Sequence, residues 1–213
     1  MTGSSLTTIQ QNCIYSIKAG EEPLSADIGI IRGKKNTLLF DVGNGEKARS
    51  LLQNALSTDS FPSSIIIVLS HFHPDHIGNL SYFYTPETTI FQGENTYKYT
   101  NCGKIVTRDL YLEDGNRYHL FPLPSSHAKG SLGLEINEEY AFLGDATYAS
   151  RKNGIVVYNA QILLEEIKTL NALKARYFLL SHQEQFVQEK QSVLEQLQEI
   201  YSHRKKDRPY IEL

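Results

Sequence analysis

The sequence predicts a layered α/β fold that is rich in strands. Short apolar or β-branched runs alternate with turn-rich joins, which is typical of strands. Three longer segments repeat apolar residues at helical spacing. A strand, a helix and a strand follow one another early in the chain, which favours a parallel pair with a helix packed on the sheet. Because no repeat and no long linker divides the 213 residues, we expect one domain over residues 1–213.

The first third of the chain predicts an antiparallel meander followed by a crossover helix. The joins between the first runs contain glycine, proline and asparagine, which favour tight turns. The helix is indicated by Ala48, Leu51, Leu52 and Ala55, which share one face. The expected elements are strands at residues 10–19, 26–32 and 37–42, a helix at 46–57 and a strand at 64–70.

The rest of the chain predicts a second set of strands and two further helices. Residues 80–101 contain six aromatic side chains, and we expect core packing for most of them; the alternative is that one or two of them line a substrate cleft. Residues 204–208 are a charge run that we expect to be solvated. The expected elements are strands at residues 104–107, 117–123, 132–136, 140–144 and 177–180, and helices at 157–174 and 184–203.

Composition excludes several classes of protein. The formal net charge of −3 gives no electrostatic reason to expect nucleic acid as a partner. No apolar run approaches the ~20 residues that a membrane-spanning helix needs, so we expect no membrane partner. Cys13 and Cys102 have no spacing typical of a disulfide framework. The first residues show no secretory signal, and we therefore expect a cytoplasmic protein.

A dense cluster of histidines follows the predicted strand at 64–70. The residues are Ser70-His71-Phe72-His73-Pro74-Asp75-His76-Ile77-Gly78-Asn79. Unpaired polar groups at the end of a buried strand cost free energy, and a bound metal would satisfy four of these side chains. His71 and His73 project to the same side of an extended segment. Pro74 favours a helix start, so Asp75 and His76 point elsewhere. This geometry predicts two metals side by side.

Three later strand ends offer the remaining ligands. His127, Asp145 and His182 each follow an apolar run directly. Taken singly, a histidine at a strand end is often only hydrogen-bonded, and Gly-Asp is often a turn. Together with the cluster, they complete a set of five histidines and two aspartates.

The order of these residues resembles the metallo-β-lactamase superfamily. The pattern is His-x-His-x-Asp-His, then His, then Gly-Asp, then His. The run Leu39-Phe40-Asp41-Val42-Gly43 is similar to the superfamily's first motif, whose Asp supports the metal shell. The resemblance implies a four-layer αββα sandwich, with two mixed β-sheets, helices on the outer faces and a dinuclear site along one edge. It implies that one metal is bound by His71, His73 and His127, the other by Asp75, His76 and His182, and both by Asp145.

A ligand set of imidazoles and carboxylates without thiolate predicts two divalent metal ions per chain. Zn²⁺ is the ion expected first, and Fe and Mn are the open alternatives. Such a pair lowers the pKa of a shared water towards ~7 and supplies a metal-bound hydroxide. We therefore expect a hydrolase that cleaves an ester-like bond in a small-molecule substrate, such as a thioester, a lactone or a related ester. Asp75 is the candidate catalytic proton acceptor. The oligomeric state is not predicted.

Other functions stay open at this point. One is a phosphodiesterase using the same site, and another is an iron-dependent oxidoreductase of the same fold, although diiron flavoproteins typically have Glu at the position of His73. A non-catalytic metal-binding module is the third. The run Asp145-Ala146-Thr147-Tyr148 resembles the Asp-Ala-x-Tyr of acyl-homoserine lactonases, which implies that Tyr148 contacts substrate; ordinary packing is the alternative. Ser126-His127-Ala128 departs from the superfamily's frequent Pro-Gly-His-Thr, so the local loop shape is not predicted.

Overall fold

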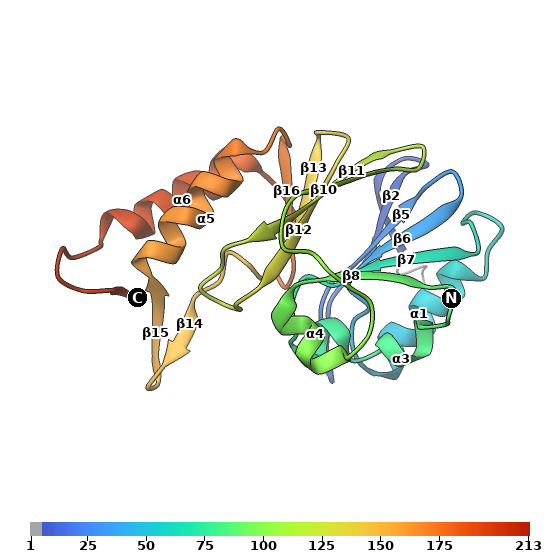
Figure 1. The fold of residues 1–213 in the computed structure, drawn as a ribbon, viewed down its shortest axis with the longest axis horizontal. Coiled ribbons are helices and arrows are strands. Elements are labelled where there is room, and N and C mark those ends of the chain that lie inside the picture. Colours follow the sequence, from blue (N-terminus) through green and yellow to red (C-terminus); the bar gives the residue numbers. More distant parts are fainter. Residues whose placement is uncertain (1–5) are drawn as a thin grey trace.

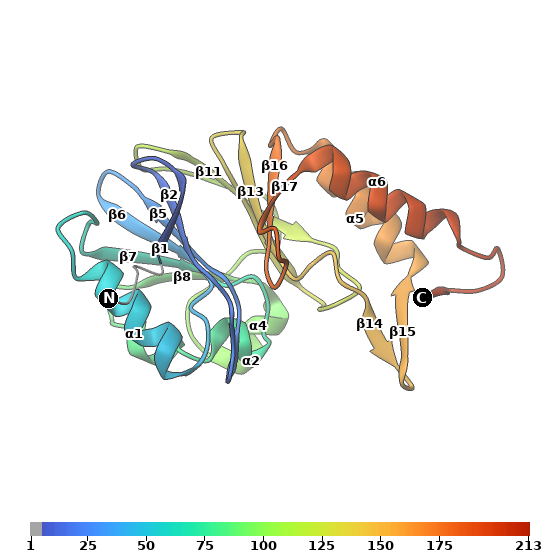
Figure 2. The same ribbon diagram turned by 180° about the vertical axis from the view of Figure 1, so that it is seen from behind.

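Two β-sheets pack face to face and carry helices on their outer faces (Figures 1 and 2). The computed structural model describes residues 6–213. This is the four-layer αββα sandwich that the resemblance implies. Helices α1, α3 and α4 cover the first sheet, and α5 and α6 cover the second. The helices are α1 (Gly45–Leu56), α2 (Pro74–Ile77), α3 (Leu80–Phe83), α4 (Glu94–Thr100), α5 (Ala160–Ala172) and α6 (Lys190–Ser202).

The first sheet has seven strands in the order β1-β2-β5-β6-β7-β8-β9. The strands from β1 to β6 form the predicted antiparallel meander. From β6 onward the pairing is parallel, because α1 crosses over between β6 and β7. Its strands are β1 (Leu6–Gln10), β2 (Ile14–Ile17), β5 (Ile28–Arg32), β6 (Asn36–Phe40), β7 (Ser64–Val68), β8 (Thr89–Gln92) and β9 (Lys104–Ile105).

The second sheet has six strands in the order β10-β11-β12-β13-β16-β17. It is mixed as well, since only β13 and β16 are parallel. Two small sheets, β3-β4 and β14-β15-β18, lie outside the sandwich. The strands of these three sheets are β3 (Gly20–Glu21), β4 (Leu24–Ser25), β10 (Leu110–Glu113), β11 (Arg117–Leu123), β12 (Ser131–Ile136), β13 (Tyr140–Gly144), β14 (Ser150–Lys152), β15 (Ile155–Asn159), β16 (Tyr177–Leu180), β17 (Val187–Glu189) and β18 (Tyr210–Glu212).

Alternation along the strands divides the interior into three layers. In β6, Leu38 and Phe40 point into the core between the two sheets, whereas Leu39 packs with α1 on the outside. In β13, Phe142 points into the same central core, and Leu143 packs under α5 and α6. Both faces of these strands are therefore apolar, as expected for strands that are covered on two sides.

Several predicted boundaries are wrong. Residues 10–19 were expected as one strand, but a turn at 11–13 separates β1 from β2. The helix expected at 157–174 begins only at 160, because the side chain of Asn159 caps it and the preceding β-branched residues pair as β15. The helix expected at 184–203 begins at 190, because residues 187–189 extend the edge of the second sheet as β17. Strands β3, β4, β8, β10, β14 and β18 were not predicted.

The expectation of core packing for most aromatic residues in 80–101 is also wrong. Phe83 and Phe91 are buried, but Tyr82, Tyr84 and Tyr99 are exposed. This segment forms the short helices α3 and α4 around β8. Tyr82 lies in α3 and Tyr99 in α4, and Tyr84 directly follows α3, where each side chain reaches the surface.

Within residues 6–213, no helix combines the length and the apolar character needed to cross a membrane.

A buried acid on α5 predicts an unusual response to pH. Glu166 is 0% exposed, and neither carboxylate oxygen has a hydrogen-bond partner among the described residues. Burial raises the pKa of Glu166 well above its ordinary value of 4.5. The folded chain then holds this proton where the unfolded chain releases it, so stability falls as pH rises above about 4.5.

We expect Glu166→Gln to remove this loss. Its free energy of unfolding should rise relative to the unmodified chain by up to about 1.4 kcal/mol per pH unit above the unfolded pKa. Urea unfolding at pH 5, 7 and 9 measures the difference, with the half-exposed Glu165→Gln on the same helix as control. A constant difference between the two chains at all three pH values would contradict the prediction.

Candidate metal centre

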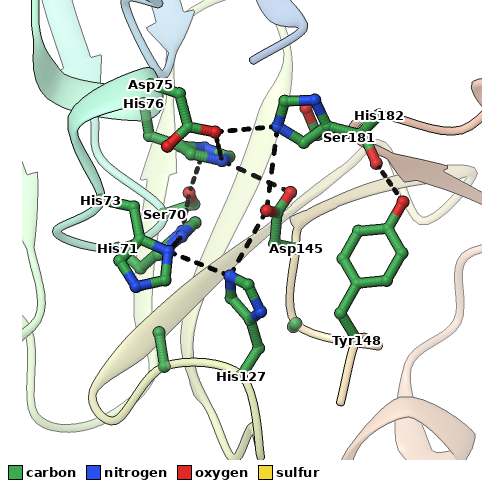
Figure 3. A network of polar contacts seen from close by, with 12 residues as sticks. Ser70, His71, His73, Asp75, His76, His127, Asp145, Tyr148, Ser181 and His182 are labelled. Atoms are coloured by element: carbon green, nitrogen blue, oxygen red, sulfur yellow. Dashed lines mark hydrogen bonds and ion pairs between the residues drawn. The ribbon is translucent and has the colours of Figure 1, made fainter. Parts of the chain in front are cut away.

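The histidine cluster lies where the chain leaves the first sheet after β7 (Figure 3). Pro74 occupies the first turn of α2, so the extended segment that carries His71 and His73 ends there, as the sequence predicts. His71 and His76 are buried, whereas His73 and Asp75 are partly exposed. One side of the cluster is therefore buried in the protein, and the other side is accessible to solvent.

His71, His73 and His127 form the first group. His127 comes from the loop between β11 and β12. Nδ1 of His73 lies 2.9 Å from Nε2 of His71 and 3.0 Å from Nε2 of His127, so three ring nitrogens converge (Figure 3). A neutral imidazole has only one N–H, and three such rings cannot all satisfy one another through the nitrogens that meet here. A cation accepts all three lone pairs at once.

The loop that carries His127 is fixed in spite of its unusual sequence. The side-chain oxygen of Ser125 accepts the His127 N–H at 3.1 Å and donates to the Ala146 carbonyl at 2.7 Å. A Cβ atom on Gly93 would collide with the carbonyl oxygen of Gly130, so glycine is needed where the loop passes the end of β8.

Asp75, His76, Asp145 and His182 form the second group. Nε2 of His182 lies 2.9 Å from Oδ2 of Asp75, and Nε2 of His76 lies 3.5 Å from the same oxygen. Asp145 follows β13 and His182 follows β16, so both come from the second sheet. One ligand atom from each of the four residues lies within 4.8 Å of the others.

The Asp145 carboxylate lies between the two groups (Figure 3). Its Oδ2 is 3.4 Å from Nε2 of His127 in the first group and 3.8 Å from Nε2 of His182 in the second. Its Oδ1 is 3.4 Å from Nε2 of His76. The structure thus brings together all seven residues that the sequence singles out and places Asp145 where the resemblance implies a bridge. That these residues bind metal stays a prediction.

The polar atoms of the centre fit a cation. Nε2 of His76 and Oδ1 of Asp145 are buried, and neither has a hydrogen-bond partner among the described residues. Each such orphaned atom costs free energy, and both point into the space between the ligands. Five imidazoles and two carboxylates without a thiolate form a donor set that suits divalent zinc, iron or manganese.

Protonation differs between the two groups. Burial lowers the pKa of His71 and of His73, and the neighbouring rings lower it further, which favours the neutral form of these two imidazoles that binds a cation.

The second group holds protons when no metal is bound. Burial opposes the charge of His76, yet Asp41 and Asp145 raise its pKa to about 10. The hydrogen bond with Asp75 raises the pKa of His182. Burial raises the pKa of Asp75, but the hydrogen bond from His182 and the charges of the neighbouring imidazoles together outweigh burial and leave the pKa below its usual range. Since metal ligands must be deprotonated, a cation entering this group displaces protons.

Asp41 supports the ligands from below. It is 0% exposed, and its carboxylate accepts the Ser70 N–H, the Ser70 hydroxyl and Nδ1 of His76, each at 2.7 Å. The Ser70 hydroxyl also lies 3.0 Å from Nδ1 of His71. These contacts fix both rings with Nε2 facing the centre. Asp41 was predicted in this supporting place; Ser70 was not, because a serine after a strand is common.

Two aromatic residues near the centre, Tyr148 and Tyr99, are candidates for substrate contact. The Tyr148 hydroxyl donates to the Ser181 carbonyl and accepts from Nε2 of Gln183, both at 2.8 Å, so it does not face the ligand atoms (Figure 3). Its role as a substrate contact stays a prediction. Tyr99 of α4 stacks on Phe72 with ring centroids 4.7 Å apart, next to the ligand pair of the first group.

Comparisons with known proteins agree with this fold. The model of the metallo-beta-lactamase superfamily matches residues 22–86, which include Asp41 and the histidine cluster. A B3 metallo-beta-lactamase with an active-site glutamic acid is similar in structure, with a TM-score of 0.71, 13% identity, and coverage of 94% of this chain and 90% of that one. An archaeal metallo-beta-lactamase superfamily protein from Sulfolobus tokodaii is also similar in structure. The TM-score is 0.60 and the sequence identity 20%, and the match covers 90% of this chain and 87% of that one. No curated protein sequence matches the chain significantly.

A flavo di-iron protein mutant from Thermotoga maritima has a TM-score of 0.72 at 14% identity, with coverage of 95% of this chain and 63% of that one. At such identities the likeness shows the fold alone. The sandwich with histidines and aspartates gathered at one edge defines a class of metal-binding α/β proteins. Within that class, residues 22–86 match the model of the metallo-β-lactamase superfamily, and a solved metallo-beta-lactamase shares the fold of the chain.

Proposed function

We propose that this chain is a metal-dependent hydrolase that cleaves a thioester, a lactone or a related ester in a small molecule. The observation that supports it most is the position of Asp145, whose carboxylate lies near His127 of the first group and near His76 and His182 of the second. A carboxylate placed in this way favours two cations side by side, which is the arrangement that two-metal hydrolysis uses.

The ligands divide between the two positions. His71, His73 and His127 would hold one ion, and Asp75, His76 and His182 the other, with Asp145 shared. Bound divalent ions would polarise the substrate carbonyl and lower the pKa of water towards ~7. With only two carboxylates among seven ligands, the centre keeps a net positive charge, which favours an anionic transition state. Zinc is the ion we propose first, because imidazole dominates the set.

Asp75 is the residue that we propose to move a proton. Its pKa is held below the usual range, so it is a carboxylate at neutral pH, and it is partly exposed on the accessible side of the centre. It can therefore orient a water molecule and accept its proton in addition to binding metal. Tyr148 is the proposed substrate contact; binding would require its hydroxyl to exchange the Ser181 carbonyl for the substrate.

A hydrolysis panel tests this function. The zinc-loaded and manganese-loaded chains are each given a thioester, an aliphatic lactone, an aryl ester, a cephalosporin and a phosphodiester. We expect turnover of at least one of the first three. Asp75→Ala should lower kcat/KM on that substrate by at least about a hundredfold. The exposed Asp59→Ala is the matched control and should leave kcat/KM unchanged.

The other outcomes separate the alternatives. Turnover of the phosphodiester alone would favour a phosphodiesterase, and oxygen uptake by the iron-loaded chain without hydrolysis would favour an oxidoreductase. No turnover of any of the five substrates, by a chain that holds its metals, would contradict the proposed hydrolysis.

A further inference from the structure

A three-residue segment directly before β5 contacts the backbone of two ligands in the second group. Ser25, Ala26 and Asp27 connect β4 to β5 and are all buried. In the sequence they show none of the ligand spacing that marks the metal centre. Their contacts nevertheless reach Asp75 on one side and His182 on the other.

The contact with Asp75 is a backbone hydrogen bond. The Ala26 N–H donates to the Asp75 carbonyl at 2.9 Å. The segment is itself anchored to the loop after β6, because the Ser25 hydroxyl oxygen accepts the Asn44 N–H at 3.0 Å. The segment therefore fixes the main chain at the start of α2, from which the Asp75 carboxylate reaches the centre.

The contact with His182 crosses from the first sheet to the second. Oδ2 of Asp27 accepts the His182 N–H at 3.0 Å, and the Asp27 N–H donates to the Ser181 hydroxyl oxygen at 2.9 Å. Oδ1 of Asp27 accepts the Ala19 N–H at 3.0 Å, so each oxygen receives one backbone donor. Asp27 is only 4% exposed, which makes these bonds difficult for water to replace.

The backbone at His182 needs this support. Its φ is +60°, in the left-handed region that a non-glycine residue rarely adopts. The Asp27 carboxylate holds the N–H of this residue, and the Tyr148 hydroxyl holds the preceding carbonyl of Ser181. The imidazole of His182 is thereby aimed at Oδ2 of Asp75, 2.9 Å away.

We infer that Asp27 is a positioning residue that sets the affinity of the second metal site by fixing His182 relative to Asp75. This inference rests on the proposed metal centre. Asp27 contacts no ligand atom, and its effect passes through the backbone. Among the described residues, no hydrogen bond joins residues 25–27 to His71, His73 or His127, so the metal affinity of the first group should not depend on Asp27. Loss of an outer partner of this kind typically weakens metal binding by about 10–100-fold.

Zinc affinity in two single-site backgrounds tests the inference. His127→Ala removes a ligand of the first group, and His182→Ala removes one of the second. Zinc is titrated into each metal-free chain against a competing chelator. We expect Asp27→Ala to weaken binding by at least about tenfold in the His127→Ala background and by less than about twofold in the His182→Ala background.

Two further variants separate positioning from folding. Asp27→Asn keeps one acceptor oxygen and should restore part of the lost affinity. Asp114→Ala is the matched control, because Asp114 accepts the Lys35 and Asn36 N–H groups and joins the two sheets at the end away from the centre. It should lower thermal stability without changing zinc affinity.

An equal loss of affinity in both backgrounds, or no loss in either, would overturn the positioning role while leaving the metal centre intact. The same holds if Asp114→Ala weakens zinc binding as much as Asp27→Ala. Absence of zinc binding by the unmodified chain would instead refute the centre itself, and with it the role of Asp27.

Discussion

Asp145→Ala is expected to lose at least one of the two bound ions and to lower kcat/KM by at least about a hundredfold. The carboxylate faces His127 with one oxygen and His76 with the other, so no neighbouring side chain can replace it. Changes in outer-shell partners alone typically cost about 10–100-fold in affinity or activity, and a shared ligand should cost more. Metal content by elemental analysis and turnover on the best substrate of the panel measure the two effects.

The control for this variant is Asp59→Ala, an exposed carboxylate outside the centre. It should retain both ions and full activity. If Asp145→Ala also retained both ions and full activity, the bridging position assigned to Asp145 would be wrong, even if the remaining six ligands were correct.

Asp41→Ala is expected to destabilise the metal-free chain by about 3–5 kcal/mol. The substitution leaves the Ser70 N–H, the Ser70 hydroxyl and the His76 imidazole buried without their acceptor. A typical domain has only about 5–15 kcal/mol of stability, so much of the protein should be unfolded at moderate temperature. Urea unfolding of metal-free protein measures the loss independently of any ion.

Two further substitutions grade this effect. Ser70→Ala removes one of the donors and keeps the carboxylate, so its cost should be near about 1–2 kcal/mol. Asp41→Asn keeps one acceptor oxygen and should lie between the two. A loss below about 1 kcal/mol for Asp41→Ala would show that the network under the ligands is not what holds them.

The ligand set could be predicted because its signal is local in the sequence. Each of His71, His127, Asp145 and His182 stands within four residues after the end of an apolar strand, and the carboxyl-terminal ends of these strands meet at one edge of the sandwich. The alternation that places Leu38 and Leu39 in different cores is also local, so the layered fold could be expected from periodicity together with the resemblance.

The features that the sequence did not predict depend on contacts between residues far apart in the chain. Asp27 and His182 are 155 positions apart, and Ser-Ala-Asp between two short strands is typical of an ordinary turn. The sequence predicts helix where β15 begins to pair, because Val157 fits the apolar spacing of α5. This segment forms a strand because it pairs with β18 near the end of the chain. Core packing was predicted for the tyrosines at 82, 84 and 99 because aromatic residues are usually buried. The sequence does not show which of these side chains face solvent.

The central claim is that one chain binds two divalent ions through seven side chains. Metal content per chain after reconstitution with zinc tests it most directly. The metal-free protein is incubated with excess zinc, freed of unbound ion and measured by elemental analysis beside protein concentration. We predict two zinc ions per chain. Less than one zinc ion per chain, in protein that is folded, would contradict the account.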